Sequence, residues 1–492
     1  MQSYTPKISV LLIKTARRAN LALGRPAAQR FRDLEAIDLT PYLPKDEPVT
    51  VQHSIAGTGT WSCQLADQLV KGMNESLYGL IEVNDMVEIR MAREPVRYGG
   101  KLPVVMRGFV SSIDRVRSMA GGTPHRRIHL AGHDYSKVLD ILRIYYLNNS
   151  AVGDNVLGSM SFFHKYVSLD NAKIMSAQEF VQLVMDEVIN KFVDGLTVDA
   201  KGNSVGTAPV RKLRAVVNIE GTVSPLSVST FTDGSAREFL SRFLDIGAFN
   251  EMFVEDREDE SLLVIRPNHF LDLNDAPIQP MADLDSLDSS TVVISDGDDI
   301  EQLTEGRTDA HVANYFWVTN DAWMVREAVE VRQLAAASSP EQYALFDYVN
   351  TSAARFGFRK MEVASAMGPP GLNHGDALSQ SAIAGETDRL MAWLAERRRI
   401  LAEQNRDNSI LESGQIVMKG YERVRRGIYL LATFGSLHVR YYAANVTHLF
   451  APMGAYRTIV DFERGTNFAT RAQLAEGQYL TELNLTGSRK TK

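Results

Sequence analysis

Apolar and polar residues alternate along much of the first third of the chain. Val87, Ile89 and Met91 alternate with charged residues, and the stretches 106–116 and 127–131 keep the same period of two. A period of two predicts β-strands with one buried face. A Gly-Gly pair and a proline separate the last two stretches, which favours a hairpin.

One segment in this part has a different period. Trp61, Leu65 and Leu69 recur at every fourth position, which predicts one face of a short helix that ends at Gly72. The strands around it form a meander, and a meander can close on itself and so remove its exposed edges. We therefore predict a small β-barrel over residues 1–147.

The middle of the chain contains two helix starts with the same chemistry. Residues 176–180 (SAQEF) and 235–239 (SAREF) both fit the Ser-x-x-Glu capping box in front of an apolar stripe. We interpret the shared pentapeptide as common capping chemistry, and the alternative is a true internal repeat. Val254 and the run 262–265 flank an acidic stretch, which predicts two strands joined by a tight turn. Residues 148–300 are therefore expected to form an α+β insert with a sheet beneath its helices.

An acidic segment follows the insert. Residues 281–306 contain eight acidic residues and no Lys or Arg, so we expect an exposed loop or linker there. A strand is predicted over 312–319 and a long loop over 368–385. A helix is predicted over about 388–405, with the run 397–399 (RRR) largely toward solvent.

The final hundred residues return to strands. Glycines interrupt short apolar stretches such as 428–431 and 439–446, which is the spacing of a second meander or barrel. We predict this second barrel, together with the helix at about 388–405, within residues 301–492. The fold class expected for the whole chain is thus α+β and mainly β, with two barrels and an insert between them.

Composition narrows the class of protein. The chain has 492 residues, 45% hydrophobic and 23% charged, which excludes a disordered or collagenous chain and fits about three domains. The net charge of -7 argues against a surface that neutralises the phosphates of a DNA duplex. The single cysteine, Cys63, excludes an internal disulfide and a thiolate metal cluster.

No targeting or membrane segment is expected. The apolar run Ile8 to Ile13 is too short for the core of a signal peptide, and no small-residue cleavage pattern follows it. No stretch of 18 consecutive apolar residues occurs, so no membrane-spanning helix is predicted. We expect a chain that is made in a reducing cytoplasm and stays soluble.

Sequence signatures of catalysis are missing. The chain has no phosphate-binding G-x-x-x-x-G-K-[ST] loop, no G-x-S-x-G elbow and no H-E-x-x-H helix. Gly57-Thr58-Gly59 lacks the later glycine of a dinucleotide-binding turn. We therefore predict no catalytic residue, no cofactor and no metal ligand.

Two clusters of residues have side chains of the kind that bind metal ions. His125, His129 and His133 are spaced by four, which on a helix would put three zinc ligands on one face. The alternation around them predicts a strand instead, so solvated or hydrogen-bonded histidines are favoured. The acidic run 296–301 lacks the alternating carboxylates of a twelve-residue calcium loop, and we interpret it as a solvated loop.

Two basic runs and the tryptophans are the residues that could contact nucleic acid. Proteins that bind single-stranded nucleic acid combine basic residues with aromatic residues on which the bases stack. The runs 397–399 and 423–426 contain no such aromatic residues between their arginines. We interpret them as a helix surface and as a strand with its charged side exposed. Trp61 and Trp393 are expected to be core or interface anchors.

The order of these elements resembles a known family. Trp61 and the stretches 85–89 (DMVEI), 107–113 (RGFVSSI) and 130–134 (LAGHD) resemble the opening barrel of the tail hub family. This family includes the central baseplate hub proteins of contractile-tailed bacteriophages, the phage late-control D proteins and the N-terminal part of type VI secretion spike proteins.

The late part of the chain resembles the second barrel of that family. The stretches that carry this resemblance are 411–417 (LESGQIV), 425–429 (RRGIY), 441–448 (YYAANVTH), 456–458 (YRT) and 462–465 (FERG). Asn314 stands where family members re-enter that barrel. The stretches 148–230 and 368–385 match nothing in the family pattern.

The resemblance implies a structural virion protein without enzymatic activity. A hub of this family is expected to form a homotrimer, in which two barrels from each chain give a ring of pseudo-sixfold symmetry that continues a hexameric tail tube. The expected partners are the tail tube protein, the central spike protein and other baseplate wedge proteins, and DNA passes through the lumen without specific binding. Assembly is expected in the host cytoplasm. Since the sequence ends at Lys492, the spike is expected to be a separate polypeptide.

Two alternatives stay open. One is a virion-associated peptidoglycan or glycan hydrolase with its carboxylates in 148–230, because such enzymes need two carboxylates at a suitable separation. The other is a different tail-tube or distal tail protein, which would carry one barrel and form a hexamer.

Overall fold

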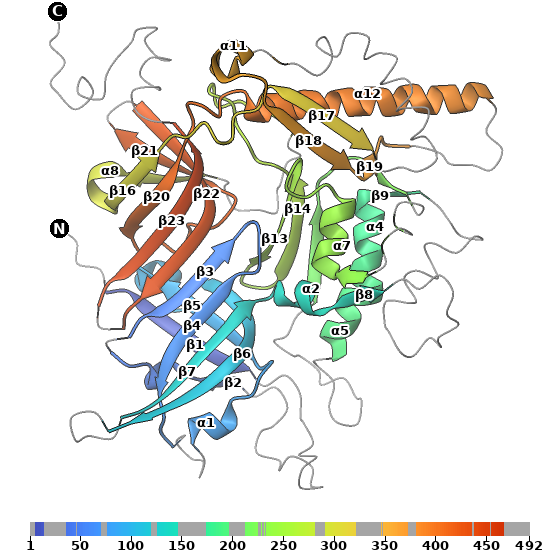
Figure 1. The fold of residues 1–492 in the computed structure, drawn as a ribbon. Helices are drawn as coiled ribbons and strands as arrows, with labels where there is room; N and C mark the ends of the chain where they lie inside the picture. The colour runs from blue at the N-terminus through green and yellow to red at the C-terminus, as the bar shows by residue number, and fades with distance from the viewer. Residues whose placement is uncertain are drawn as a thin grey trace, which may run out of the picture.

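A computed structural model gives the fold (Figure 1). It describes residues 5–13, 36–45, 47–69, 76–119, 125–145, 174–195, 212–224, 228, 231, 233–280, 291–320, 346, 348–371, 380–434, 437–452 and 454–466.

The first third of the chain is a curved antiparallel sheet. Its described strands are β1 (Lys7–Ile13), β2 (Ala36–Asp38), β3 (Val49–Ser54), β4 (Thr60–Ala66), β5 (Met86–Ala92), β6 (Val104–Ser118) and β7 (His125–Asp134). They lie in the order β3-β4-β7-β6-β5-β1-β2. One face encloses a core that contains Trp61, Leu65, Ile89 and Leu130. The predicted strands and the β6–β7 hairpin are confirmed.

The helix predicted from Trp61 to Leu69 is wrong. Trp61, Cys63 and Leu65 are all buried on β4, which is the period of a strand. Trp61 and Leu65 are four residues apart, a spacing that fits both periods, and Cys63 between them decides for the strand. Leu69 is 68% exposed, and Gly72 lies outside the described residues.

The last part of the chain forms a second β region. Its described strands are β15 (Thr291–Ser295), β16 (Ile300–Gly306), β20 (Glu412–Lys419), β21 (Tyr429–Phe434), β22 (Leu437–Phe450) and β23 (Tyr456–Gly465). β15 runs parallel to β21, and the other pairs are antiparallel. This region has a core of its own, which includes Ile294, Tyr441 and Val460.

The expectation of an exposed loop over 281–306 is wrong for the part that is described. Residues 281–290 lie outside the described residues, but 291–306 form β15, the short helix α8 (Asp296–Asp299) and β16. Their partners β21 and β20 come more than a hundred positions later in the chain. The composition of 291–306 carries no information about strands that come more than a hundred residues later. The acidic residues by themselves therefore predicted a loop.

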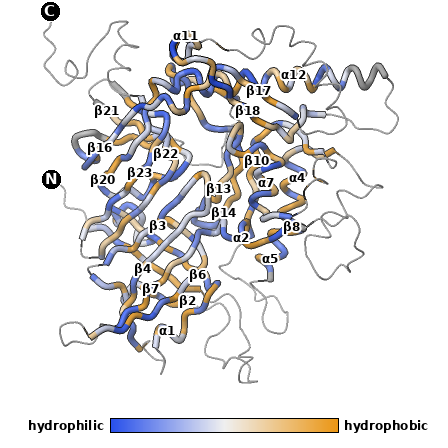
Figure 2. The backbone as a smooth tube through the Cα atoms, viewed as in Figure 1, coloured by the Kyte–Doolittle hydropathy of each residue, from blue (hydrophilic) through white to orange (hydrophobic). Residues whose placement is uncertain are grey.

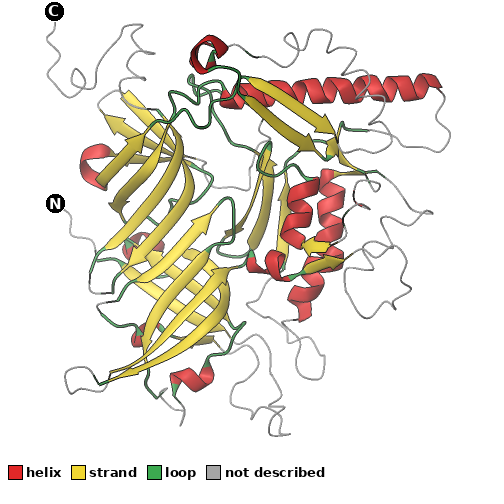
Figure 3. Cartoon of the chain, viewed as in Figure 1, coloured by secondary structure: helices red, strands yellow, loops and turns green. Residues whose placement is uncertain are grey.

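The two β regions join edge to edge. β3 pairs antiparallel with β22, with Gln52 opposite Thr447 and Val49 opposite Phe450. The described strands of both regions thereby form one thirteen-stranded sheet that ends on β2 and β16. The mainly β, α+β class is confirmed, whereas two closed barrels are not, because the sheet is open. Figure 3 shows the two curved halves side by side.

The insert packs against the first β region. Strands β10 (Leu213–Val217), β13 (Asn250–Asp256) and β14 (Ser261–Pro267) form a sheet in the order β10-β14-β13, as the predicted strand-turn-strand requires. Met86 and Phe109 from the first region belong to the insert's core. β5, predicted to have one buried face, is therefore buried on both.

The insert's helices begin where the sequence predicts. α4 (Ala177–Val184) and α7 (Ala236–Phe243) each have a complete capping box, made by Ser176 with Glu179 and by Ser235 with Glu238. Each serine oxygen accepts a hydrogen bond from an otherwise unpaired backbone N–H of the first turn. Figure 2 shows hydrophobic residues concentrated along β13 and β14, beside these helices.

Short elements complete the insert and its surroundings. They are α1 (Leu77–Leu80), α2 (Lys137–Ile141), α5 (Asn190–Gly195), β8 (Arg143–Tyr145), β9 (Met175–Ser176), β11 (Thr222–Val223), β12 (Asp233–Ser235) and β19 (Met367–Gly368), with single-turn 3-10 helices at Thr40–Tyr42, Pro95–Tyr98 and Val349–Thr351 and a π-helical turn at Met185–Ile189. Of the loop predicted over 368–385, residues 372–379 lie outside the described residues, and the prediction is wrong for 380–385, which form the first turns of a helix.

A long helix lies across one end of the molecule. α12 (Gln380–Asn405) confirms the predicted helix and begins eight residues earlier. It packs on β17 (Tyr315–Asn320) and β18 (Lys360–Ser365), near the short helix α11 (Ala353–Phe356). β17 pairs in parallel with β18 and is separate from the large sheet, so the re-entry into a second barrel expected after Asn314 is not observed. No helix in the described part is long and apolar enough to cross a membrane.

The expectation that the arginine run on α12 faces solvent is wrong for two of three residues. Arg397 is 5% exposed and Arg398 is 8% exposed, whereas Arg399 is exposed and pairs with Glu396. The Arg397 guanidinium lies 4.2 Å from the ring centre of Trp393 and 4.7 Å from that of Phe249. Stacking on two aromatic faces stabilises a buried guanidinium, which a count of charges along the helix does not reveal.

Candidate functional site

Four arginines lie where the first β region, the insert and the last β region meet. We call Arg107, Arg266, Arg425 and Arg426, with the groups they bind, the arginine junction. Arg107 comes from β6, Arg266 from β14, and the other two from the connection between β20 and β21. Arg107, Arg266 and Arg426 are buried, so their charges need partners inside the protein.

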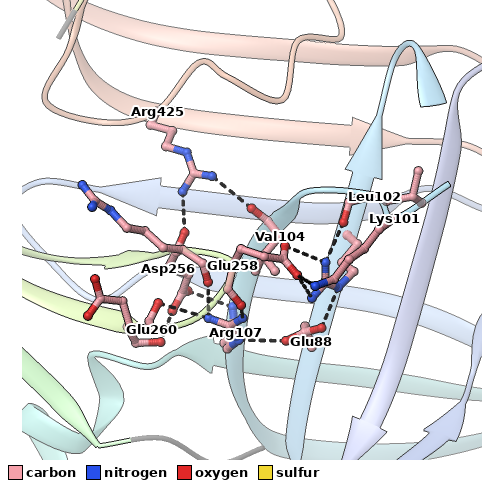
Figure 4. A network of polar contacts seen from close by, with 12 residues as sticks. Glu88, Lys101, Leu102, Val104, Arg107, Asp256, Glu258, Glu260 and Arg425 are labelled. Atoms are coloured by element: carbon pink, nitrogen blue, oxygen red, sulfur yellow. Dashed lines mark hydrogen bonds and ion pairs between the residues drawn. The ribbon is translucent and has the colours of Figure 1, made fainter. Parts of the chain in front are cut away.

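Arg107 binds the β13–β14 turn of the insert. Its Nε donates to Glu88 at 2.8 Å, and its Nη atoms donate to the carbonyl oxygens of Arg257 at 2.6 Å, Glu258 at 2.8 Å and Glu260 at 3.2 Å (Figure 4). Its backbone N–H donates to Asp256 at 2.8 Å. A single guanidinium thereby fixes the turn of the insert to the first sheet.

A second set of ion pairs holds the same turn. Arg90 donates to both carboxylate oxygens of Glu258, at 2.9 and 3.0 Å, and Lys101 pairs with the same group. Partial burial opposes ionisation of Glu258, but the hydrogen bonds from Arg90 and Lys101 lower its pKa to about 2. Glu258 is therefore charged at neutral pH and contributes to the attachment.

Arg425 and Arg426 attach the last β region to both other parts. Arg425 donates to the carbonyl oxygens of Asp256 at 2.8 Å and Val104 at 3.0 Å. Arg426 donates to Ser54 O at 3.0 Å, to the Asp134 carboxylate at 3.2 Å and to Val254 O. The prediction of an exposed charged strand over 423–426 is wrong, because this segment is a connection whose last arginine is buried.

Arg266 completes the junction from the insert side. It pairs with Glu251, which also accepts a hydrogen bond from the Tyr442 hydroxyl of β22. Arg266 Nη2 donates to the carbonyl oxygen of Gly427. Burial raises the pKa of Glu251, and the charge of Arg266 opposes that effect. Arg266 thereby offsets part of the cost of burying the Glu251 carboxylate at the contact between the insert and the last β region.

A further polar contact joins the two β regions directly. Tyr98 donates to Glu422 at 2.7 Å, and the backbone N–H of Arg93 donates to the same carboxylate at 3.0 Å. The Arg93 side chain pairs with Asp299 at 3.1 Å. These groups line an open hollow of about 440 Å³.

The junction has the properties of a structural connection. Its carboxylates accept hydrogen bonds from guanidinium, hydroxyl or backbone donors, and the cavity beside His53, Phe253 and Arg426 measures about 20 Å³, which is room for one water molecule. A reacting substrate needs an acid or base that faces open space. The geometry therefore serves to hold three parts of the chain in a fixed arrangement.

The histidines weighed as zinc ligands lie on a strand, as predicted. His129 and His133 are on β7, and His129 lines a hollow of about 450 Å³ with Glu47, Gln64 and Arg127. The side chain of His125 is outside the described residues. Within the described ranges, no group of three His, Cys, Asp or Glu side chains could hold a metal ion.

The acidic run forms ion pairs within regular secondary structure, and both tryptophans pack against other side chains. In the run 296–301, Asp299 pairs with Arg93 and Glu301 pairs with Arg457. This run is a helical turn followed by a strand, not the loop that was expected. Trp61 is buried in the first core, as predicted, and Trp393 packs partly buried under Arg397.

The span proposed for a hydrolase falls mostly outside the described residues. Five carboxylates of this span are described. Glu179 caps α4, Asp186 accepts hydrogen bonds from Gln182, Glu187 pairs with Lys191, Asp194 pairs with Lys212 at 3.0 Å, and Glu220 is exposed. Each of these contacts is local. They give no support for a pair of catalytic carboxylates.

Sequence reasoning missed the arginine junction. A signal was present, because Arg107 stands alone among apolar residues in the run 104–110 (VVMRGFV). A charged residue at a buried strand position needs a partner. The partners, on a turn about 150 residues later, could not be read from the local pattern.

The chain was compared with known proteins. No family model and no curated protein matches it. Among solved structures it is similar to a tail protein from Neisseria meningitidis MC58, with 9% identity over 94% of this chain and 97% of that chain and a TM-score of 0.45.

Two further solved structures are similar over most of the chain. One is the 43 kDa tail protein of prophage MuSo2 from Shewanella oneidensis, with 11% identity, coverage of 94% of this chain and 97% of that chain, and a TM-score of 0.42. The other is prophage tail protein gp18 from Listeria monocytogenes EGD-e, with 9% identity, coverage of 95% and 98%, and a TM-score of 0.41. All three are tail proteins, the class that the sequence resembles. Since every TM-score is below 0.5, no residue role is transferred from them.

Proposed function

We propose that this chain is a structural protein of a phage tail, the central hub of the baseplate. In this proposal three copies form a ring that adapts a hexameric tail tube to a trimeric central spike and lets DNA pass on ejection. The observation that carries the proposal is the edge-to-edge pairing of β3 with β22, which joins two β regions with separate cores into one sheet.

This arrangement fits a threefold ring that mimics six subunits. Each chain supplies two β regions, so three chains supply six. Among the described strands, the sheet of one chain ends on β2 and β16, and uncovered sheet edges invite pairing with other chains. Neighbouring copies in a closed ring would cover them.

The arginine junction supports a mechanical role. A hub transmits force between tube and spike, so its parts must keep their relative positions. Buried, multiply hydrogen-bonded guanidinium groups lose much of their interaction energy when their partners shift. Arg107 and Arg426 connect the insert and both β regions in this way.

The remaining expectations belong to the same proposal. The proposed parts are residues 1–147, 148–300 and 301–492, and the arginine junction lies where they meet. The last β region also takes in β15 and α8, which precede residue 300, because β15 pairs with β21. The partners are the tail tube protein, the central spike protein and baseplate wedge proteins, and the protein acts in the virion after assembly in the host cytoplasm. The net charge of -7 suits a lumen through which DNA slides without being retained.

Native mass spectrometry of the full chain tests the proposal. The expected species is a trimer. A hexamer would favour a tail-tube or distal tail protein instead, and a monomer under all conditions would contradict the ring. A cell-wall zymogram separates the hydrolase alternative, since a hub produces no clearing.

A further inference from the structure

The end of the β6–β7 hairpin carries two arginines in an unfavourable arrangement. Arg117 on β6 lies directly opposite Arg126 on β7, and both side chains are exposed. Neither guanidinium group has a hydrogen bond or ion pair within the described part of the chain. Like charges directly opposite each other destabilise a strand pair, so something other than the stability of this hairpin accounts for them.

The surroundings of the two arginines have the composition of a protein interface. Arg115, two positions before Arg117, is already satisfied by Asp67 at 2.7 Å and lies 5.0 Å from the ring centre of Tyr78. Met119, directly after β6, is 70% exposed, and Leu69, two residues after the Asp67 whose backbone N–H donates to Arg126 O, is 68% exposed. Arginine, tyrosine and methionine are enriched at protein interfaces. We call Leu69, Tyr78, Arg117, Met119 and Arg126 the hairpin patch.

An acidic surface lies on the other β region. Asp298, before β16, and Glu301 and Glu305, on β16, are exposed, and no Lys or Arg occurs between residues 291 and 306. Glu301 pairs with Arg457 and Glu305 accepts a hydrogen bond from Tyr441. Lys419 donates to the backbone carbonyl oxygen of Asp298, whereas no described side chain pairs with the Asp298 carboxylate. We call Asp298, Glu301 and Glu305 the acidic edge, because β16 ends the described sheet.

The two surfaces are far apart within one chain. Figure 1 shows the free end of the β6–β7 hairpin at the bottom of the molecule and β16 toward the top left. A contact between them must therefore join two copies. Two different patches that meet in this way make a head-to-tail interface, and such an interface closes into a ring when the rotation allows it.

We propose that the hairpin patch of one copy binds the acidic edge of the next copy. This inference rests on the proposed function, because it assumes a ring of identical chains. The exposed apolar residues of the patch supply buried area, and the two arginines supply charge complementarity, which selects the partner and the orientation. Arg117 and Arg126 are thus specificity residues of assembly.

A charge-reversal variant tests the contact in the full chain. By sedimentation velocity over a dilution series, we expect R117E/R126E to raise the dissociation constant for self-association by about tenfold or more. Adding D298K/E301K to the same chain should restore most of the lost affinity for self-association, because the charges on both surfaces are then reversed. The control K7E/K45E changes the net charge equally at exposed positions without a described partner and should associate as the unmodified chain does.

Thermal unfolding of the single variant Arg126→Glu separates association from folding. The change places Glu opposite Arg117, so the hairpin should gain a favourable cross-strand pair and the Tm of the dissociated chain should not fall. If R117E/R126E associates as tightly as the control variant, the inference is wrong while the trimer stands. If the unmodified chain stays monomeric at every concentration, both fail. If the variant loses only binding to a DNA duplex, the patch is a nucleic-acid contact and the inference is overturned.

Discussion

The guanidinium of Arg426 lies 3.2 Å from the carboxylate of Asp134, although 292 positions separate the two residues. Both side chains are buried. The pair connects the end of β7 in the first β region with the connection before β21 in the last one. It therefore reports directly on whether the two ends of the chain are held together.

A double-mutant cycle on this pair should give a large coupling energy. We expect Arg426→Met and Asp134→Asn to couple by about 1 to 3 kcal/mol in urea unfolding, because each leaves a buried polar group without its partner. The exposed pair Arg214–Glu260, at 2.8 Å, is the matched control and should couple by less than about 1 kcal/mol. Equal coupling in the two cycles would contradict a special role for the junction.

Removing the Arg107 guanidinium should loosen the insert. Arg107→Met keeps the apolar stem but leaves Glu88 and the carbonyl oxygens of Arg257 and Glu258 without this donor. We expect the free energy of unfolding to fall by about 3 to 5 kcal/mol. Arg117→Met, at an exposed position of the same strand, should change it by less than about 0.5 kcal/mol. The prediction fails if the two variants are equally stable.

Buried His448 should make the protein less stable in acid. Burial, with a smaller contribution from Arg425, lowers the pKa of His448 to about 3, below the value of about 6.5 expected in the unfolded chain. Between these values the unfolded chain binds a proton that the folded chain does not. Stability therefore falls as the pH falls, by about 1.4 kcal/mol per pH unit.

The variant His448→Gln isolates this effect. Its free energy of unfolding should depend less steeply on pH than that of the unmodified chain, with the difference in slope near 1.4 kcal/mol per pH unit between about pH 6 and pH 5. Contributions from other groups cancel in the comparison. Gln302→Ala, at an exposed position without a titratable group, serves as control and should keep the slope. Identical slopes in all three proteins would refute the assignment.

Gly132 should tolerate no side chain. A Cβ at this position of β7 would meet the carbonyl oxygen of Phe109 and Nε1 of buried Trp61. We expect Gly132→Ala to reduce the free energy of unfolding by about 1 to 3 kcal/mol, because the strands cannot approach as closely. Gly57→Ala is the control, since a Cβ there has nothing within 4 Å. A loss as large at Gly57 as at Gly132 would rule out this explanation.

Features that are formed by residues close together in the sequence could be predicted from the sequence. The capping boxes at Ser176 and Ser235 involve four neighbouring residues, and both helices begin as predicted. The alternation at 106–116 and 127–131 predicted the β6–β7 hairpin for the same reason. The helix over 388–405 was found too, since its apolar period spans several turns.

Features that depend on segments far apart in the sequence could not be predicted from it. β15 and β16 form because β21 and β20 pair with them, and the acidic composition of 291–306 hides this. Arg397 and Arg426 are buried because aromatic rings and carbonyl oxygens from other parts of the chain surround them. The pairing of β3 with β22 likewise joins strands from opposite ends of the chain and could not be read from either strand alone. A local period predicts an element, but it does not predict which distant element covers it.

We propose that three copies of this chain form a ring with six similar β regions. Electron cryo-microscopy of the purified full chain, alone or on the assembled tail, tests it most directly. We predict a ring of three copies in which two β regions of each chain alternate around a central channel. A ring of six copies, or particles without a ring at any concentration, would contradict the account.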